Sequence, residues 1–135
     1  MLSLDEQRRL RRRLDRIYGI ALFIVGIGAT IVNMQALTEQ SIVMQIAAMF
    51  EQYEAGDYVR AEGLAALGWA GIVAHPLNYA LWLYVALRRW RAERFAAWCA
   101  IVGAVIGWLI TVGVLAIAAG MHPRLVDAVL ASVGG

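Results

Sequence analysis

The sequence predicts an all-α integral membrane protein with three transmembrane helices, a basic amino-terminal juxtamembrane helix and an outer amphipathic helix. Two observations predict this class. Hydrophobic residues make up 61% of the 135 residues and charged residues only 16%, whereas soluble globular domains average about 45–50% and ~25%. All charged residues also lie outside three long uncharged runs.

The uncharged runs are long enough to cross a bilayer. They contain 22, 25 and 29 residues, and ~20 apolar residues cross a hydrocarbon core about 30 Å thick. The first run is not a cleaved signal peptide, because its apolar core is too long and no small-x-small cleavage site follows it. We therefore predict one membrane domain over 1–135, divided into a basic helix 1–16, span 17–38, outer segment 39–62, span 63–87, loop 88–94, span 95–121 and outer segment 122–135.

The distribution of charge predicts an orientation. Residues 1–16 carry six arginines and three acidic residues, and residues 88–94 carry four arginines and one glutamate. Residues 38–62 carry five acidic residues and one arginine. Because arginine and lysine collect in cytoplasmic loops, we expect a multi-pass protein of the bacterial plasma membrane, with its amino terminus in the cytoplasm and its carboxyl terminus outside.

The amino terminus has the pattern of a helix. Ser3 and Glu6 fit a capping box, and Leu10, Leu14 and Ile17 share one face of the helix that would follow. Basic residues surround that face beside the first span, where each attracts anionic lipid by roughly 1 kcal/mol. We expect orientation and lipid anchoring rather than a regulatory-lipid or nucleic-acid site. The expected headgroup contacts are Arg8, Arg9, Arg11, Arg12, Arg13 and Arg16.

Residues 39–62 contain an amphipathic helix of about four turns. Its apolar contact face is predicted to consist of Ile42, Ile46, Met49, Phe50 and Tyr53. The helix has no basic face, which argues against binding to anionic headgroups. Its apolar face is expected to pack either on the outer ends of its own spans or on another protein.

Two residue types mark the ends of helices in the outer segments. Gly56 is a natural stop for the amphipathic helix, because glycine adopts the backbone angles that end a helix. Pro123 predicts the start of a second short surface helix, because proline is favoured at the first helical position.

Small residues recur at helical spacing in the first and third spans. Such residues let helix backbones approach closely in lipid, and they can serve packing within this chain or assembly with another. The expected helix-packing positions are Gly26, Thr30, Cys99, Gly103, Gly107 and Thr111.

The second span carries polar residues at its centre. His75, Asn78 and Tyr79 share one helical face, and Pro76 leaves the carbonyl of Ile72 without its usual donor. One interpretation is a kinked helix whose polar side chains join helices, with His75 or Asn78 satisfying that carbonyl or bonding across an interface. The other interpretation is a midmembrane site for a proton or ligand.

The sequence gives little support to other chemistries. His75 and His122 lie at different depths, which argues against a shared haem, and Cys99 alone can form neither an internal disulfide nor a zinc cluster. No nucleophile is accompanied by a base and an orienting acid. We therefore expect no enzyme activity, no metal and no cofactor.

Three loose motifs carry a resemblance to a known family. They are a "QY-x-x-G-x-Y" turn, an arginine pair that ends a span, and "R-x-A-x-W" leading into a glycine-rich span; here their residues are Gln52, Tyr53, Gly56, Tyr58, Arg88, Arg89, Arg94, Ala96, Ala97 and Trp98. Over roughly residues 17–120 the chain resembles small actinobacterial multi-span membrane proteins grouped as a domain of unknown function. The resemblance implies an actinobacterial plasma membrane and a bundle of three or four spans, but no activity.

Two functions of different classes follow from these observations. The first is a non-catalytic accessory subunit of a larger membrane complex, respiratory or of the cell envelope, that docks on other integral membrane subunits through its small-residue faces. The second is a small transporter or channel component in which His75 and Asn78 line a path in a homo-oligomer.

Overall fold

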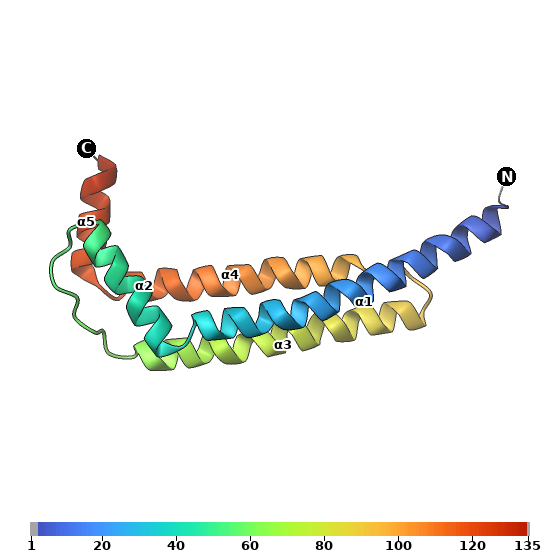
Figure 1. Ribbon diagram of the computed structural model, residues 1–135, viewed down its shortest axis with the longest axis horizontal. Coiled ribbons are helices and arrows are strands. Elements are labelled where there is room, and N and C mark those ends of the chain that lie inside the picture. Colours follow the sequence, from blue (N-terminus) through green and yellow to red (C-terminus); the bar gives the residue numbers. More distant parts are fainter. Residues whose placement is uncertain (1–2, 135) are drawn as a thin grey trace.

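The computed structural model describes residues 3–134 as a bundle of helices (Figure 1). Three of these helices are long and apolar enough to span a membrane, as the sequence predicts. The long helices α1, α3 and α4 lie side by side, and α2 and α5 lie together at one end of them. The helices are α1 (Leu4–Ala36), α2 (Glu39–Gln52), α3 (Leu64–Arg91), α4 (Trp98–Gly120) and α5 (Pro123–Gly134).

The predicted basic helix and the first predicted span form one continuous helix, α1. Its start is fixed by the expected capping box, in which the Glu6 N–H donates to Ser3 Oγ and the Ser3 N–H donates to the Glu6 carboxylate. The 33 residues of α1 extend about 50 Å at 1.5 Å per residue. Because this exceeds the hydrocarbon thickness, the arginine-bearing end of α1 projects beyond α3 and α4 (Figure 1).

Helix α2 lies across the opposite end of the bundle and closes it. Thr38 caps its amino terminus by accepting a hydrogen bond from the Ser41 N–H. Ile42, Ile46 and Phe50 are at most 4% exposed. The sequence left open whether the apolar face of α2 packs on its own spans or on another protein. In the structure it packs on its own bundle. A cluster of apolar residues forms this cap together with α2: Leu37, Leu64, Val114, Ala118 and Leu125, with Met49 and Tyr53 packed against it.

The end of α2 differs from the expected one. The left-handed residue that stops the helix is Glu54, with φ 51°, and the Ala55 N–H donates to the Phe50 carbonyl at 2.9 Å. This bond back across the last turn is the one that a left-handed residue after a helix permits. Gly56 is also left-handed, with φ 85°. It lies in the loop after α2 and does not end the helix.

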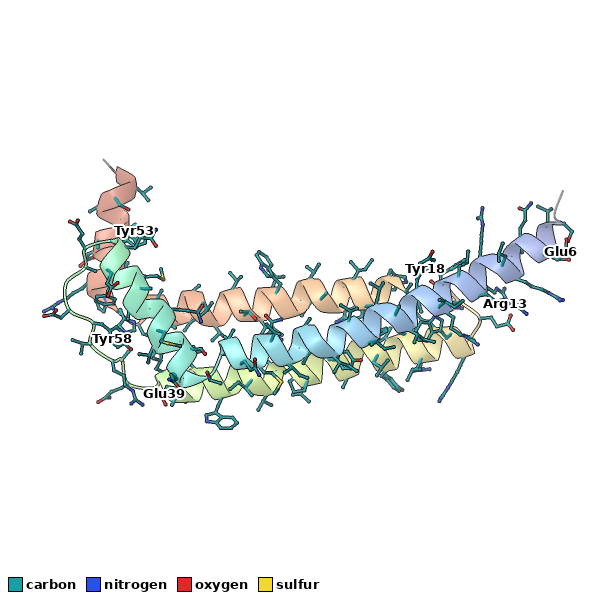
Figure 2. The ribbon with its side chains drawn as sticks, viewed as in Figure 1. Glu6, Arg13, Tyr18, Glu39, Tyr53 and Tyr58 are labelled. Carbon is teal, nitrogen blue, oxygen red and sulfur yellow. The ribbon has the colours of Figure 1, made fainter. Side chains whose placement is uncertain are left out.

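Helix α5 begins at Pro123 as predicted and completes the cap. The preceding residue, His122, is 5% exposed and lies against the rings of Phe50 and Tyr58, with centroids 5.6 and 5.5 Å away. Its Nδ1 donates to the Ala118 carbonyl at 2.8 Å. Figure 2 places Tyr53 and Tyr58 at this end, far from Glu6 and Arg13.

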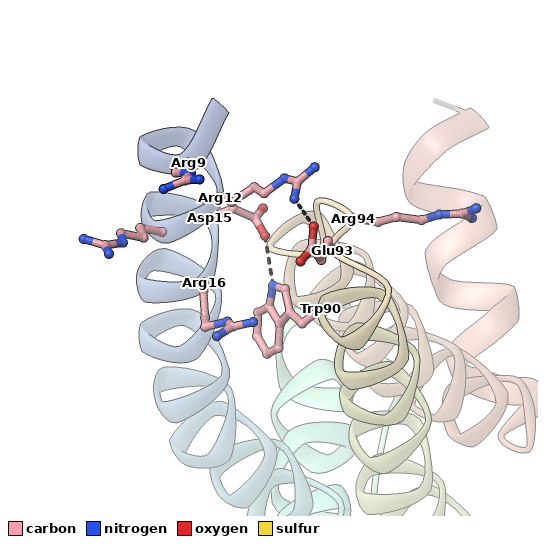
Figure 3. A pocket seen from close by; sticks show the side chains of 8 residues that line it. Arg9, Arg12, Asp15, Arg16, Trp90, Glu93 and Arg94 are labelled. Carbon is pink, nitrogen blue, oxygen red and sulfur yellow. Dashed lines mark hydrogen bonds and ion pairs between the residues drawn. The ribbon is translucent and has the colours of Figure 1, made fainter. Parts of the chain in front are cut away.

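The arginine-rich end is held by Asp15 of α1. Its carboxylate accepts hydrogen bonds from the N–H groups of Ala96 and Ala97, each at 3.0 Å, and from the Trp90 indole at 2.9 Å (Figure 3). The first N–H groups of a helix have no partner within the helix. Asp15 therefore caps α4 from another helix, which explains why α4 begins at Trp98 although the uncharged run begins at residue 95.

The apolar core is divided between the two ends of the bundle. The cap cluster occupies one end, and a smaller cluster of Phe23, Ala86, Ala96 and Cys99 lies near the other. Between them the facing surfaces of α1, α3 and α4 carry polar side chains, which form the site described below.

We expect Gly68 to be essential for the approach of α3 to the cap. A Cβ added there would lie 2.6 Å from the carbonyl oxygen of Leu37, whereas one added at Gly28 would meet no atom within 4 Å. Gly68→Ala should lower the free energy of unfolding by about 1–3 kcal/mol, whereas Gly28→Ala should not lower it, because alanine is a better helix former than glycine where there is space for its methyl group. Unfolding in mixed micelles, followed by circular dichroism, measures both variants; equal losses would contradict the close approach.

The environment of Asp15 lowers its pKa. Burial raises the pKa of this carboxyl, but hydrogen bonds from Ala97, Ala96 and Trp90, together with the charge of Arg89, outweigh burial and hold the pKa below its usual value of 3.8. A group whose pKa is lower in the folded state stabilises the fold above its unfolded pKa and loses this contribution as the pH falls through the folded pKa.

The stability of the bundle should therefore fall in acid through Asp15. We expect the contribution of Asp15 to the free energy of unfolding to be constant between about pH 7 and pH 5 and to fall below about pH 4. The Asp15→Asn variant should be less stable at neutral pH, and its free energy of unfolding should decrease less as the pH falls below about 4. Asp5→Asn, which alters an exposed carboxylate in the first turn of α1, should keep the native profile. An unchanged profile in Asp15→Asn would show that the cap contributes nothing.

Candidate functional site

A groove of about 260 Å³ lies between α1 and α4, with α3 at its base. Its lining combines small, apolar and polar side chains from all three long helices. From α1 come Leu22, Phe23, Val25, Gly26, Ala29, Thr30 and Asn33; from α3 His75, Asn78, Tyr79 and Trp82; and from α4 Ala100, Ile101, Gly103, Ala104 and Gly107. We call this the intramembrane groove.

A chain of hydrogen bonds crosses all three helices beside the groove. The hydroxyl of Thr111 donates to Asn33 Oδ1 at 2.9 Å, and His75 Nε2 lies 3.0 Å from the same hydroxyl. Because that hydroxyl has a single hydrogen, His75 Nε2 is the donor in the second bond. Asn33 in turn donates to the Ala29 carbonyl at 2.8 Å. Side chains of α3, α4 and α1 are thus joined at the middle of the bundle.

Two further side chains of α3 bond to backbone carbonyls of its neighbours. Asn78 Nδ2 donates to the Gly103 carbonyl of α4 at 2.8 Å, and the Tyr79 hydroxyl donates to the Phe23 carbonyl of α1 at 3.0 Å. The Tyr79 and Phe23 rings also meet edge to face, with centroids 5.9 Å apart. The polar face of α3 therefore contacts both other long helices.

The predicted glycine positions face α3 of the same chain. A Cβ at Gly103 would lie 3.2 Å from Trp82, one at Gly26 would lie 3.3 Å from Tyr79, and one at Gly107 would lie 3.7 Å from His75. These glycines allow the large side chains of α3 to fit between α1 and α4. They serve packing within the chain, and they also form part of the groove wall.

The structure brings together two sets of residues that the sequence predicted separately, the helix-packing residues and the midmembrane polar residues. Gly26, Thr30, Gly103 and Gly107 of the expected packing set line the same groove as His75, Asn78 and Tyr79 of the expected midmembrane site. The remaining packing positions lie close by: Cys99 is buried in the smaller apolar cluster, and Thr111 takes part in the hydrogen-bond chain.

Pro76 has a different role from its neighbours. It does not line the groove, and α3 continues through it from Leu64 to Arg91. The sequence allowed His75 or Asn78 either to satisfy the Ile72 carbonyl or to bond to another helix. In the structure both side chains bond to α4.

The predicted headgroup arginines divide into two sets. Arg9, Arg12, Arg13 and Arg16 line a cavity of about 260 Å³ at the projecting end of α1, whereas Arg8 and Arg11 do not. The other residues lining this cavity, which we call the arginine-rich pocket, are Asp15, Trp90, Glu93 and Arg94.

Sequence reasoning missed the partners of the polar residues. Asn33 is the single asparagine of the first uncharged run, and Asp15 is the carboxylate nearest the start of the first span; both were signals of a buried role that the pattern of neighbouring residues did not explain. Trp90 carried no such signal, because aromatic residues are common at the ends of spans.

The polar side chains that line the groove are Thr30, Asn33, His75, Asn78, Tyr79 and Trp82. Among its described lining residues no carboxylate, guanidinium or amine is present, and the side chains of His75, Asn78 and Tyr79 already bond to neighbouring helices. Within residues 3–134, no three His, Cys, Asp or Glu side chains gather where they could hold a metal ion.

Comparison with known families places the chain in one of them. Residues 3–128 match a family described as "Family of unknown function (DUF6264)". The chain belongs to the DUF6264 family. The predicted membership of a family of unknown function is thereby confirmed. No curated protein and no solved structure matches the chain.

We expect His75 and Thr111 to stabilise this DUF6264 protein as a pair. In a double-mutant cycle of His75→Ala and Thr111→Val, the coupling free energy should be about 0.6–2 kcal/mol, the range of hydrogen bonds between membrane helices. Thr30→Val is the control, because Thr30 lines the groove without taking part in the hydrogen-bond chain. A coupling of His75 to Thr30 as large as that to Thr111 would contradict a specific bond.

Proposed function

We propose that this chain is a non-catalytic accessory subunit of a larger bacterial membrane protein complex, and that it docks through the intramembrane groove. The occupant that we propose is a transmembrane helix of another integral membrane subunit. The observation that carries the proposal is the composition of the groove: small residues predominate on its α4 wall, and Gly26, Ala29 and Thr30 lie on its α1 wall.

Small residues on both walls favour a helix as the occupant. Ala29 of α1 and Ala104 of α4 are exposed, and Gly26 and Ala100 lie beside them at partial exposure. In lipid, helices associate through close backbone approach and dispersion contacts, because apolar surface alone gives no preference for protein over lipid. A groove with small residues on both sides lets apolar side chains of a partner reach the polar residues of α3.

We also propose the orientation that the charge distribution favours. Arginines lie at the end of the bundle formed by α1 and the α3–α4 loop, and acidic residues lie in the segment between α1 and α3. With arginines on the cytoplasmic side, the α2–α5 cap faces outward from an actinobacterial plasma membrane. Anionic lipids are the proposed partners of the arginine-rich end, and nucleic acid is not.

The first experiment is extraction of the tagged protein from its native membrane in mild detergent, followed by native gels and mass spectrometry. The proposal expects a stoichiometric complex with at least one other integral membrane protein. Migration as a single chain or as a homo-oligomer would overturn it.

Groove-filling variants then test the docking surface. We expect Ala29→Phe and Ala104→Phe to weaken the complex by about 5- to 150-fold, the effect of 1–3 kcal/mol of overpacking. Ala21→Phe and Ala116→Phe are the matched controls, because both alanines are exposed on the same helices but outside the groove. Equal retention of the partner by all four variants would exclude the groove as the interface.

The runner-up function is a transporter or channel component, favoured by the position of His75 and Asn78 in the groove. That function predicts a homo-oligomer and a flux that His75→Ala abolishes while the bundle stays folded. The accessory function predicts that His75→Ala lowers stability modestly and leaves the partner bound.

A further inference from the structure

The arginine-rich pocket has a charge arrangement that the docking function does not use. Arg9, Arg12, Arg13 and Arg16 fall within an arc of about 100° on α1, as their spacing of three and four residues requires. Across the pocket, Trp90 lies in the last turn of α3, and Glu93 and Arg94 belong to the α3–α4 loop. The pocket is therefore built from segments about 75 to 85 residues apart in the sequence, and not from a linear basic run alone.

Both carboxylates of the pocket are already engaged. Asp15 accepts three N–H groups from Trp90, Ala96 and Ala97, and Glu93 pairs with Arg12 (Figure 3). The loop holds Glu93 in this position through its left-handed backbone, with φ 53°, and through the bond from the Arg94 N–H to the Arg89 carbonyl. With five arginines and two carboxylates among its lining residues, the pocket keeps an excess of positive charge.

The other arginines are spread around the pocket, and one of them, Arg16, lies beside the aromatic ring of Trp90. Within residues 3–134, no carboxylate pairs with Arg9, Arg13, Arg16 or Arg94. Figure 3 shows Arg16 beside the Trp90 ring, Arg12 directed toward the loop, and Arg94 extending to the far side of the loop. Guanidinium groups bind phosphate through paired N–H donors, so this arrangement suits a phosphate group.

An exposed apolar stripe continues from the pocket along the same face of α1. Ile20, Ile24 and Ile27 are 47%, 63% and 49% exposed, and they follow Arg13 and Arg16 at intervals of three to four residues. A phosphate bound in the pocket would therefore lie at the end of a surface suited to an acyl chain. This stripe is distinct from the intramembrane groove, which does not include these isoleucines.

We infer that the arginine-rich pocket binds the phosphate group of one anionic lipid, with an acyl chain of that lipid along the isoleucine stripe. A phosphate group could also come from a soluble phosphorylated compound, and the apolar stripe favours the lipid. The inference goes beyond the general attraction of a basic helix for an anionic membrane, because it requires particular arginines and a defined stoichiometry.

Lipid binding by the full chain in detergent micelles tests this inference. Phosphatidic acid is the probe, phosphatidylcholine is the reference lipid, and native mass spectrometry counts bound lipids at 0.15 M salt, where long-range attraction is screened. We expect one phosphatidic acid per chain. Arg16→Gln and Arg9→Gln should each weaken binding by about tenfold, the effect of losing a charged hydrogen bond.

Arg11→Gln is the matched control. Arg11 lies on the same helix and carries the same charge but does not line the pocket. It should change binding by less than about twofold, whereas a purely general attraction would give about the same fivefold loss for every arginine. Equal losses in Arg11→Gln and Arg16→Gln, or no retained phosphatidic acid, would overturn the inference.

A second arm distinguishes the source of the phosphate. Inorganic phosphate at millimolar concentration should not displace the bound lipid, because it lacks the contacts of the acyl chain. If inorganic phosphate alone binds with the same dependence on Arg16 and the lipid does not, the lipid as ligand is overturned. Neither the lipid-binding experiment nor the phosphate competition involves the intramembrane groove. A negative result in either one therefore contradicts the lipid site without contradicting the proposed docking of a partner helix.

Discussion

The bundle depends on the hydrogen bonds that α3 makes to its two neighbours. In a membrane, lipid solvates apolar helix surfaces as well as a neighbouring helix does, so specific contacts must hold the helices together. The two apolar clusters lie at the ends, and the middle is joined by His75, Thr111 and Asn33. Because these bonds have fixed geometry, they set the rotation of each helix about its axis and thereby decide which residues face inward.

The groove follows from the same constraint. Once α3 directs its large polar and aromatic side chains between α1 and α4, glycines must stand opposite them, and Gly26, Gly103 and Gly107 do so. The alanines beside these glycines are then left on the rim, where Ala29 and Ala104 are exposed. Packing within the chain and a surface for another helix are thus two results of one arrangement of small residues.

Sequence reasoning found the features that depend on local pattern. The spans, the capping box, the start of α5 and the shared face of His75, Asn78 and Tyr79 all follow from periodicity, charge and the intrinsic preferences of single residues. It did not find the pairing of His75 with Thr111, because that bond joins residues 36 positions apart. Nor did it find the cap that Asp15 provides for α4, because the bonded residues are 81 and 82 positions apart. The left-handed Glu54 was missed for a different reason: glycine is the residue that usually takes this conformation at the end of a helix, so Gly56 was expected instead.

The continuity of α1 gives the protein a mechanical property. One helix runs from the apolar bundle into the arginine-bearing segment without a flexible joint, and Asp15 fastens it to Trp90 and to the start of α4 just before the apolar stretch begins. The projecting segment and the first span are therefore parts of one helix. A force on the arginine-bearing segment at the membrane surface acts on the first span through an unbroken backbone, and on α3 and α4 through Asp15.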